Sequence, residues 1–373
     1  MAKQLSSLDM HFLLKELKGL ENSRVDRIYN LGKEEAYVQL HKSNAGKSIL
    51  RIILGKAIFL ALEKSIDEAP SGFCMLLRIH LEGKFLDSIK QLEPERILEL
   101  VFKSKDEKRI LYIEFFGKGN IVLCDDSNKI IDALIRHKFK DRTIFPKEQY
   151  KHPSMKYNIF DIKDNQLAVL LKESTKDKVI TSLATELGLG GLYSEEVCLL
   201  SNIDKNTAPN EISEKQIKNI INSIKKLINK KLNSKIIFEN DEFIDITPID
   251  LEFYKDYKNK GFSSFSEALG EYFAHELKST KKKESPYTNK INELNRIIEE
   301  QKVSLSELKS KEEENRKKAE AIYHNYQLIK EILDEINKAS KKYSWEEIKE
   351  KLKGHKLIKD VDVKDKMVVI EIN

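Results

Sequence analysis

Cysteine is scarce in this sequence, which has only Cys74, Cys124 and Cys198 among its 373 residues. Because these three are far apart and odd in number, they do not suggest a disulfide framework, and we interpret them as small buried residues of a reducing cytoplasm. The eight histidines are scattered as well, and none lies beside another ligand at a spacing typical of metal sites. The sequence therefore predicts no metal and no other cofactor.

Long apolar segments are also absent. No run approaches the ~20 apolar residues that a membrane-spanning helix needs. The opening residues, MAKQLSSLD, contain no apolar signal core and include an early acid, Asp9, which argues against secretion. We therefore expect a cytoplasmic protein with no membrane contact.

A marked excess of one charge is missing too. Lys and Arg together number 66, and Asp and Glu number 61, which gives a net charge of +5. An excess this small does not by itself indicate nucleic-acid binding, so the distribution of the basic residues has to decide.

The first part of the chain mixes helix and strand signals. Apolar spacing predicts helices over 10–20 and 70–86. Short apolar or alternating runs predict strands over 25–30, 36–41, 48–54, 57–62, 96–102, 110–116 and 120–124. This order of elements predicts an antiparallel α+β domain with two packed sheets over residues 1–152.

After a proline-flanked junction the pattern becomes helical, and we predict a second domain over 153–280. Two short amphipathic helices lead into Gly188-Leu189-Gly190, and a third helix follows over 194–200. Glycines between two helices suit a helix-hairpin-helix, in which backbone N–H groups approach a phosphate. They suit an ordinary glycine-ended turn equally well.

A further helix, predicted over 213–232, has isoleucines on one side and lysines on the other. The lysines are Lys215, Lys218, Lys225, Lys226, Lys230 and Lys231. Because a lysine face is usually solvated surface, it adds only modest support for phosphate contact at the neighbouring glycine turn.

The third part predicts a coiled-coil arm over 281–340 and a small α/β tip over 341–373. The arm is on the order of 70 Å long at 1.5 Å per residue. The apolar seam of a coiled coil needs a partner helix to cover it. We therefore expect self-association with a second copy or, preferably, pairing with a returning arm that this chain lacks. The seam residues are Ile291, Leu294, Ile298, Gln301, Leu305, Leu308, Glu312, Asn315, Ala319, Ile322, Tyr326, Ile329, Leu333 and Ile336.

Local patterns offer no set of groups for catalysis, and we predict no catalytic residue. Asp9 precedes a helix and fits an N-cap, and Glu95-Arg96 fits a surface ion pair of little weight. A basic cluster after a strand is either a phosphate-facing patch or a solvated loop. Its members are Arg136, His137, Lys138, Lys140 and Arg142.

A set of short motifs runs in order along nearly the whole chain: Leu5-Ser6-Ser7-Leu8-Asp9, Arg27-Ile28-Tyr29-Asn30, Ala69-Pro70-Ser71-Gly72-Phe73-Cys74-Met75, Arg78-Ile79-His80-Leu81, Gly119-Asn120-Ile121-Val122-Leu123, Gly188 to Val197, and Ala321-Ile322-Tyr323-His324-Asn325-Tyr326. Together they resemble the NFACT family, which comprises RqcH in prokaryotes and NEMF in eukaryotes and is called fibronectin-binding protein in older usage. The N-terminal motifs look nearer to archaeal and eukaryotic members than to bacterial ones.

The resemblance implies a part in ribosome-associated quality control, as an RNA-binding factor and not as an enzyme. Members bind a large ribosomal subunit obstructed by peptidyl-tRNA and recruit tRNA to it. Untemplated residues, alanine in the prokaryotic case, are then added to the stalled chain. The resemblance also implies an N-terminal fold similar to the Fpg/MutM glycosylases, and it identifies this chain as the N-terminal half of such a factor.

The family's tRNA-contacting residues fall on Asp9 and on Glu95-Arg96, where the family has an Asp-Arg pair and the Glu here is one methylene longer. With Arg136, Gly188 and Gly190, these form the predicted RNA-binding set. A glycosylase or lyase acting on DNA is one alternative, although the chain begins Met1-Ala2 without a proline amine and has no four-cysteine zinc finger. A surface adhesin is a second alternative, against which the missing signal peptide argues.

Overall fold

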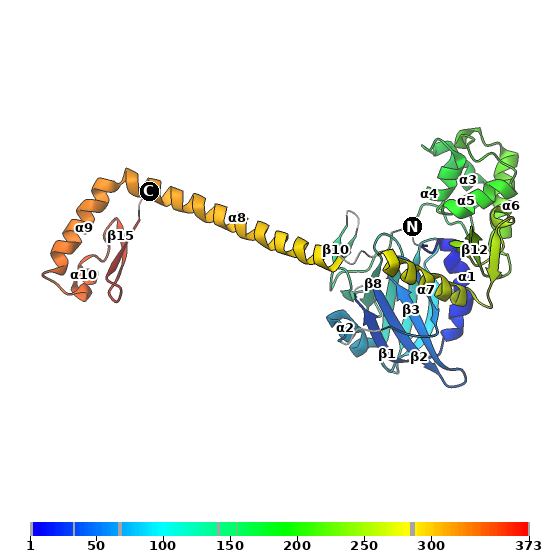
Figure 1. Cartoon of the computed structure of the whole chain (residues 1–373), viewed down its shortest axis with the longest axis horizontal. Coiled ribbons are helices and arrows are strands. Elements are labelled where there is room, and N and C mark those ends of the chain that lie inside the picture. Colours follow the sequence, from blue (N-terminus) through cyan, green and yellow to red (C-terminus); the bar gives the residue numbers. More distant parts are fainter. Residues whose placement is uncertain are drawn as a thin grey trace. The chain divides into compact units, whose positions relative to one another are not determined.

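The computed structural model describes residues 3–32, 34–65, 69–139, 142–153, 155–283 and 288–371 (Figure 1). The chain divides into two compact units, Met1–Lys281 and Lys282–Asn373. The first unit thus holds both of the stretches that the sequence separates at residue 152, and that boundary stays a prediction.

The first unit opens with a helix and continues in an α+β arrangement. The helices are α1 (Ser7–Leu17), the short 3-10 turn η1 (Lys18–Leu20) and α2 (Gly72–Leu81). The strands are β1 (Arg24–Leu31), β2 (Glu35–Lys42), β3 (Gly46–Ile53), β4 (Ala57–Ala61), β5 (Phe85–Gln91), β6 (Ile97–Lys103), β7 (Lys108–Glu114), β8 (Asn120–Cys124), β9 (Ile130–Ala133), β10 (His137–Lys138) and β11 (Thr143–Ile144).

Strands β1 to β9 form one antiparallel sheet in the order β4-β3-β2-β1-β5-β6-β7-β8-β9, so the two packed sheets that the sequence predicts are the halves of one continuous sheet. The halves join where the start of β1 meets the start of β5, with Arg24 opposite Phe85. Both halves contribute side chains to one core, among them Leu50 and Leu100. The sequence missed this link because the start of β5 falls at the end of the predicted helix over 70–86.

Helix α1 joins this core to a second one. Leu13 and Leu17 pack among the side chains of the sheet, whereas Leu8 and Phe12 pack in a core that the later helices build. Residues four apart lie on the same side of a helix, so each pair faces its own core. The first turn of α1 is therefore held between the sheet and the helical region.

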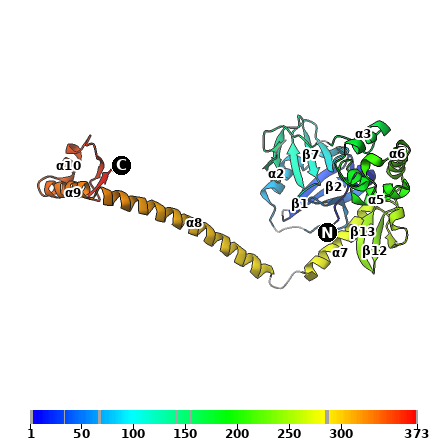
Figure 2. The same cartoon turned by 90° about the horizontal axis from the view of Figure 1, so that it is seen from above.

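The helical region consists of α3 (Asp164–Glu173), α4 (Val179–Thr185), α5 (Gly191–Leu200), the 3-10 turn η2 (Pro209–Glu211) and α6 (Glu214–Ile228), which gather beside the sheet (Figures 1 and 2). As their spacing predicts, the isoleucines of α6 face the second core. Gly188 and Gly190 lie in the turn between α4 and α5. The classification of this turn as a helix-hairpin-helix stays a prediction.

The first unit ends with a small sheet and a helix that pack back on the first core. Strands β12 (Lys235–Glu239), β13 (Glu242–Thr247) and β14 (Lys258–Gly261) form a sheet in the order β13-β12-β14, with the 3-10 turn η3 (Glu252–Tyr254) between β13 and β14. Helix α7 (Phe265–Lys283) follows. Ile236, Ile246 and Leu269 from these elements join the core of the nine-stranded sheet.

The second unit consists of α8 (Thr288–His324), α9 (Tyr326–Ser340), α10 (Trp345–Lys351), β15 (Ile358–Asp362) and β16 (Met367–Ile370). The predicted rod is not one continuous helix, because it breaks at Asn325, whose backbone angles (φ −104, ψ 20) leave the helical region. Beyond the break, Ile332 and Ile336 of α9 pack against Ile358 and Val361 of the tip. The tip thus covers the end of the predicted seam. Coiled-coil pairing of the remainder stays a prediction.

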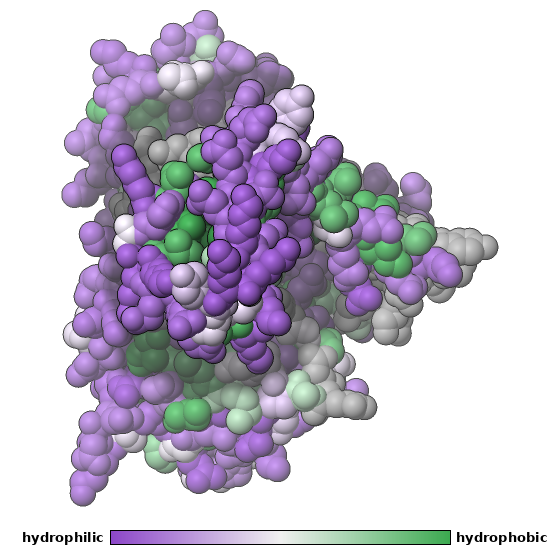
Figure 3. Space-filling model, turned by 90° about the vertical axis from the view of Figure 1, so that its left-hand side faces the viewer, coloured by the Kyte–Doolittle hydropathy of each residue, from purple (hydrophilic) through white to green (hydrophobic). Residues whose placement is uncertain are grey.

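Among the described residues, no helix is both long and apolar enough to cross a membrane. The face shown in Figure 3 is mainly hydrophilic, with apolar residues in small groups.

Candidate functional site

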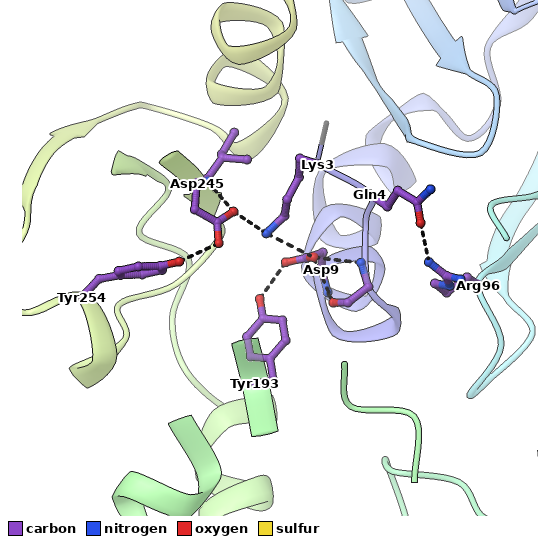
Figure 4. Close-up of polar contacts among 9 residues, drawn as sticks. Lys3, Gln4, Asp9, Arg96, Tyr193, Asp245 and Tyr254 are labelled. Carbon is purple, nitrogen blue, oxygen red and sulfur yellow. Dashed lines mark hydrogen bonds and ion pairs between the residues drawn. The ribbon is translucent and has the colours of Figure 1, made fainter. Parts of the chain in front are cut away.

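One cleft stands out in the first unit. Its volume is about 510 Å³, and its walls come from the N-terminal segment with the start of α1, the turn between β5 and β6, residues around Met155, and the turn before α5 together with the first residues of α5. Phe116, after β7, lines it as well, so five segments that are remote in sequence meet at one hollow. Figure 4 shows part of this region from close by.

Five of the six residues predicted to bind RNA line this cleft, namely Asp9, Glu95, Arg96, Gly188 and Gly190. The sixth, Arg136, does not line it. Its guanidinium is exposed and pairs with the Asp132 carboxylate at 2.8 Å. Contact between any of these residues and RNA stays a prediction.

Asp9 is fully buried, and its carboxylate is occupied within the protein. One oxygen accepts hydrogen bonds from the backbone N–H and the hydroxyl of Ser6, both at 2.9 Å. The other oxygen accepts the Tyr193 hydroxyl at 2.6 Å. Ser6 is the N-cap of α1 and Asp9 is the third helical residue of a capping box. Asp9 therefore shapes the wall of the cleft rather than serving as the N-cap itself.

Lys3 extends this network across the first unit. Its ammonium group lies 2.7 Å from the Asp245 carboxylate and 4.0 Å from that of Asp9. The other Asp245 oxygen accepts the Tyr254 hydroxyl at 2.8 Å (Figure 4). Burial acts to lower the pKa of Lys3, but the carboxylates of Asp9 and Asp245 outweigh it and raise that pKa above its ordinary value. The amine therefore keeps its proton.

Arg96 is a half-buried cation on the opposite wall, and burial lowers its pKa. Its closest polar contact is a long hydrogen bond of 3.4 Å to the side-chain oxygen of Gln4 (Figure 4). The described residues form no ion pair with it within 4.0 Å, although the nearby Glu95 carboxylate acts to raise its pKa and so opposes the effect of burial. A guanidinium without a carboxylate partner has donors available for an acceptor that enters the cleft.

Glu95 lies beside Arg96, and one of its carboxylate oxygens, Oε1, is buried without a hydrogen-bond partner in the described part of the chain. Burial raises the pKa of Glu95, opposed in part by the backbone N–H of Met155. The turn that carries both residues is tied to α1 by Gln91, whose side-chain N–H groups donate to the hydroxyl of Ser7 at 2.8 Å and to the backbone oxygen of Glu95 at 3.1 Å. Gln91 thus holds this turn against the start of α1.

The turn before α5 depends on glycine at two positions. Gly188 and Gly190 have φ values of 81° and 78°, which side chains rarely tolerate. A Cβ at Gly188 would also come within 2.6 Å of the Met155 side chain. Gly190 is the N-cap of α5 and offers no side-chain cap, and the first turn of α5 contains no acid. The first N–H groups of α5 thus lack a side-chain cap, and the residues that carry them, Gly191 to Tyr193, line the cleft.

The members of the basic cluster that the sequence suggests differ in burial and in their ion-pair partners. Arg142 is buried and forms a two-bonded ion pair with Glu114, whereas Arg136 is exposed and pairs with Asp132. Lys140 lies outside the described residues. Within the described ranges, no group of three or more His, Cys, Asp or Glu side chains could hold a metal ion.

Sequence reasoning missed Lys3, Gln91 and Tyr193, the side chains that hold the cleft together. Their partners lie far along the chain: Tyr193 is 184 residues from Asp9, and Lys3 is 242 residues from Asp245. Local spacing of residues in the sequence cannot predict hydrogen bonds between such distant side chains. The one available signal was Tyr193 itself, which stands three residues after Gly190.

The fold and the cleft agree with a family assignment. Residues 6–368 match the family described as the NFACT N-terminal and middle domains, and the chain belongs to the NFACT family. A similar protein is the archaeal Rqc2 homolog aRqcH of Methanocaldococcus jannaschii, which is 31% identical over 372 residues, covering 95% of this chain and 55% of the relative. The Drosophila melanogaster homolog of the ribosome quality control complex subunit NEMF is 23% identical over 437 residues, covering 100% of this chain and 43% of that protein. The chain thus spans about half the length of these relatives.

Solved structures agree on the fold of the first unit. The fibrinogen binding protein from Staphylococcus aureus has a TM-score of 0.61 at 19% identity, covering 72% of this chain and 98% of that one. The N-terminal part of the fibronectin/fibrinogen-binding protein from Streptococcus suis has a TM-score of 0.59 at 23% identity, covering 73% and 100%. The likeness to MutM (Fpg) from Thermus thermophilus, with a TM-score of 0.33, is too distant to bear on fold or chemistry.

Proposed function

We propose that this chain is the tRNA-binding half of a ribosome-associated quality control factor. The complete factor binds an obstructed large ribosomal subunit that holds peptidyl-tRNA. It recruits tRNA, alanyl-tRNA in our proposal, for untemplated extension of the stalled chain. Family membership and the names of the relatives from Methanocaldococcus jannaschii and Drosophila melanogaster support this role.

The observation that carries the proposal is the cleft. Arg96, whose guanidinium forms no ion pair with the residues that the structure describes, and the N-terminus of α5 line the same hollow. Guanidinium groups and helix N-termini are both suited to phosphate oxygens. The acceptor oxygen of Glu95, unpartnered among the described residues, adds a group that can receive a hydrogen from a base or a ribose. The three features together suit a nucleotide segment with its phosphate.

The two alternatives receive less support from the cleft. A glycosylase that forms a Schiff base needs an amine with a lowered pKa, but the Lys3 amine in this cleft has a raised pKa because of Asp9 and Asp245. The names of the Staphylococcus aureus and Streptococcus suis proteins record fibrinogen or fibronectin binding, yet identities of 19% and 23% support a common fold alone.

A filter-binding titration of tRNA with the Arg96→Ala variant tests the proposal. A charge-assisted hydrogen bond contributes about 1.5–3 kcal/mol, so we expect affinity at low salt to fall roughly tenfold to a hundredfold. Arg24→Ala is the matched control, because Arg24 is an exposed arginine of the same unit that does not line the cleft.

Equal losses in the two arginine variants would show that tRNA responds only to overall charge and would refute the cleft as its site. Absence of tRNA binding by the unmodified chain at low salt would refute the proposal for this half of the factor. Borohydride trapping of the chain on damaged DNA would instead establish the glycosylase alternative.

A further inference from the structure

The polar side of α6 is a second cationic surface, away from the cleft. Its exposed residues are Glu214, Lys215, Lys218, Asn219, Asn222, Lys225 and Lys226. At 3.6 residues per turn these positions fall within an arc of about 140°, and they span roughly 18 Å of helix. Glu214, at the first position, is the single acid of the helix. This face, the α6 lysine stripe, thus presents four ammonium groups and one carboxylate.

The lysines of the stripe have no ion-pair partner in the described part of the chain, whereas Lys230, just beyond the end of α6, pairs with Glu196 at 3.5 Å. Helix α8 shows the usual arrangement for comparison. Its Lys302 lies 3.3 Å from Glu299, and its Lys318 pairs with Glu314. Two lysine-rich helices of one protein therefore differ in whether the charge is neutralised within the helix.

The opposite side of α6 is fixed in the core. Ile220, Ile224 and Leu227 are almost completely buried there, and a capping box formed by Ser213 and Gln216 closes the first turn. The stripe is therefore carried on a rigid rod and keeps its spacing when a partner approaches.

We propose that the α6 lysine stripe binds the phosphate backbone of double-helical RNA, without reading its sequence, as a second RNA contact beside the cleft. Four cations on one face of a rigid helix suit the closely spaced phosphates of a duplex. The stripe has no aromatic residue on which unpaired bases could stack, which distinguishes it from single-strand sites.

A membrane surface fits the stripe less well. A helix that lies on a membrane inserts its apolar side among the lipids, but the apolar side of α6 is already buried in the protein. Asn219 and Asn222, which lie between the lysines, also supply neutral donors for phosphate oxygens. The inference rests on the proposed function, so its test uses a duplex that has no tRNA features.

The test measures binding of the 373-residue chain to a blunt RNA duplex of about two helical turns, over a range of salt concentrations. The variant is Lys218→Gln with Lys225→Gln on the stripe. Each phosphate contact contributes about 0.9 to the slope of log affinity against log salt, so the slope falls by roughly 1.8 and affinity at 0.1 M salt drops at least about tenfold.

The matched control is Lys302→Gln with Lys318→Gln on α8, which removes the same charge from lysines that are paired. We expect it to keep the full slope, and we expect Lys218→Arg with Lys225→Arg to restore binding. Equal losses in both glutamine variants, or no loss in either, would overturn the inference. So would stripe-dependent binding to phosphatidylserine vesicles without binding to the duplex.

The Arg96→Ala variant separates this inference from the proposed function. Because Arg96 lies in the cleft, its replacement leaves duplex affinity within about twofold of the unmodified chain if the stripe acts independently. A loss of duplex binding as large as that of the stripe variant would show that duplex RNA enters the cleft and would overturn the separate site.

Discussion

Two helices begin at the same cleft, and they begin in opposite ways. The first turn of α1 is closed by Ser6 and Asp9, which form a capping box. The first turn of α5 starts at Gly190 with neither a side-chain cap nor an acid. Every α-helix begins with backbone N–H groups that lack partners within the helix. At α1 the protein supplies acceptors for them, whereas at α5 it leaves them facing the hollow.

This difference indicates a division of roles within the cleft. The Asp9 carboxylate is occupied by Ser6 and Tyr193, so the start of α1 is a fixed wall. The start of α5 has no side-chain cap, and the guanidinium of Arg96 makes one long side-chain hydrogen bond. Both can therefore donate hydrogen bonds to a ligand in the cleft. Under the proposed function, Asp9 builds the site, whereas Arg96 and the start of α5 would contact RNA.

The largest expected effect comes from removing the fixed wall. Asp9→Ala leaves the buried hydroxyl of Tyr193 and the N–H of Ser6 without their acceptor, and it removes one of the two carboxylates beside Lys3. We expect the free energy of unfolding to fall by about 3–5 kcal/mol, measured by urea denaturation. The control Asp87→Ala, which breaks an exposed pair with Lys103, costs at most about 1 kcal/mol. Similar losses in the two variants would contradict the structural role of Asp9.

A smaller effect is expected from placing an acid at the open helix end. Gly191 is exposed, and a Cβ there meets nothing within 4 Å, so Gly191→Glu fits without strain. Compared with Gly191→Gln, we expect it to stabilise the fold by about 0.3–1 kcal/mol, because the acid faces the positive end of α5. The same charge weakens tRNA binding by roughly tenfold, because it repels phosphate at close range.

Stability and binding thus move in opposite directions in this one variant. Thermal unfolding and filter binding of the two Gly191 variants measure both. If the Glu variant bound tRNA as well as the Gln variant, the start of α5 would not be a phosphate contact, and the contrast between the two helix ends would lose its functional meaning.

The smallest expected effect is a pH dependence of stability that comes from the ionisation of Glu95. Burial raises the pKa of Glu95 above its ordinary value. Since its folded pKa exceeds its unfolded pKa, its contribution to stability is present at low pH and is lost as the pH rises through the folded value. Glu95→Gln therefore gains stability relative to the unmodified chain as the pH rises from 4 to 7, which urea denaturation at each pH measures.

The affinity for tRNA is expected to depend on the ionisation of the same carboxyl group. As the pH falls through the raised pKa of Glu95, the carboxyl group takes up a proton. It keeps a carbonyl oxygen as an acceptor but no longer repels phosphate, so we expect tRNA affinity to rise roughly twofold to fivefold. The Glu95→Gln variant should lose this part of the rise. An identical pH profile in both proteins would place the titrating group elsewhere.

The sequence predicted much of the local structure. The spacing of the isoleucines identified α6 (Glu214–Ile228) and the side of it that is buried. It did not predict the small strands β12 to β14, nor the break at Asn325. These features depend on contacts between distant segments, such as Ile236 with the first core and Ile336 with the tip. A local sequence pattern cannot predict such contacts.

The candidate site was predictable to a different degree. Motif resemblance selected Asp9, Glu95, Arg96, Gly188 and Gly190, and these residues line one cleft. It did not distinguish the buried carboxylate of Asp9 from the accessible guanidinium of Arg96. Burial and hydrogen-bond partners decide that distinction, and both arise only when segments about 90 to 180 residues apart are brought together.

Ultraviolet crosslinking of tRNA to the 373-residue chain, with the crosslinked peptides identified by mass spectrometry, tests the central claim most directly. The account predicts crosslinks in three segments that line the cleft, residues 4–7, 94–96 and 188–192, and their loss in the Arg96→Ala variant. Crosslinks that avoid all three segments and persist in that variant would contradict it.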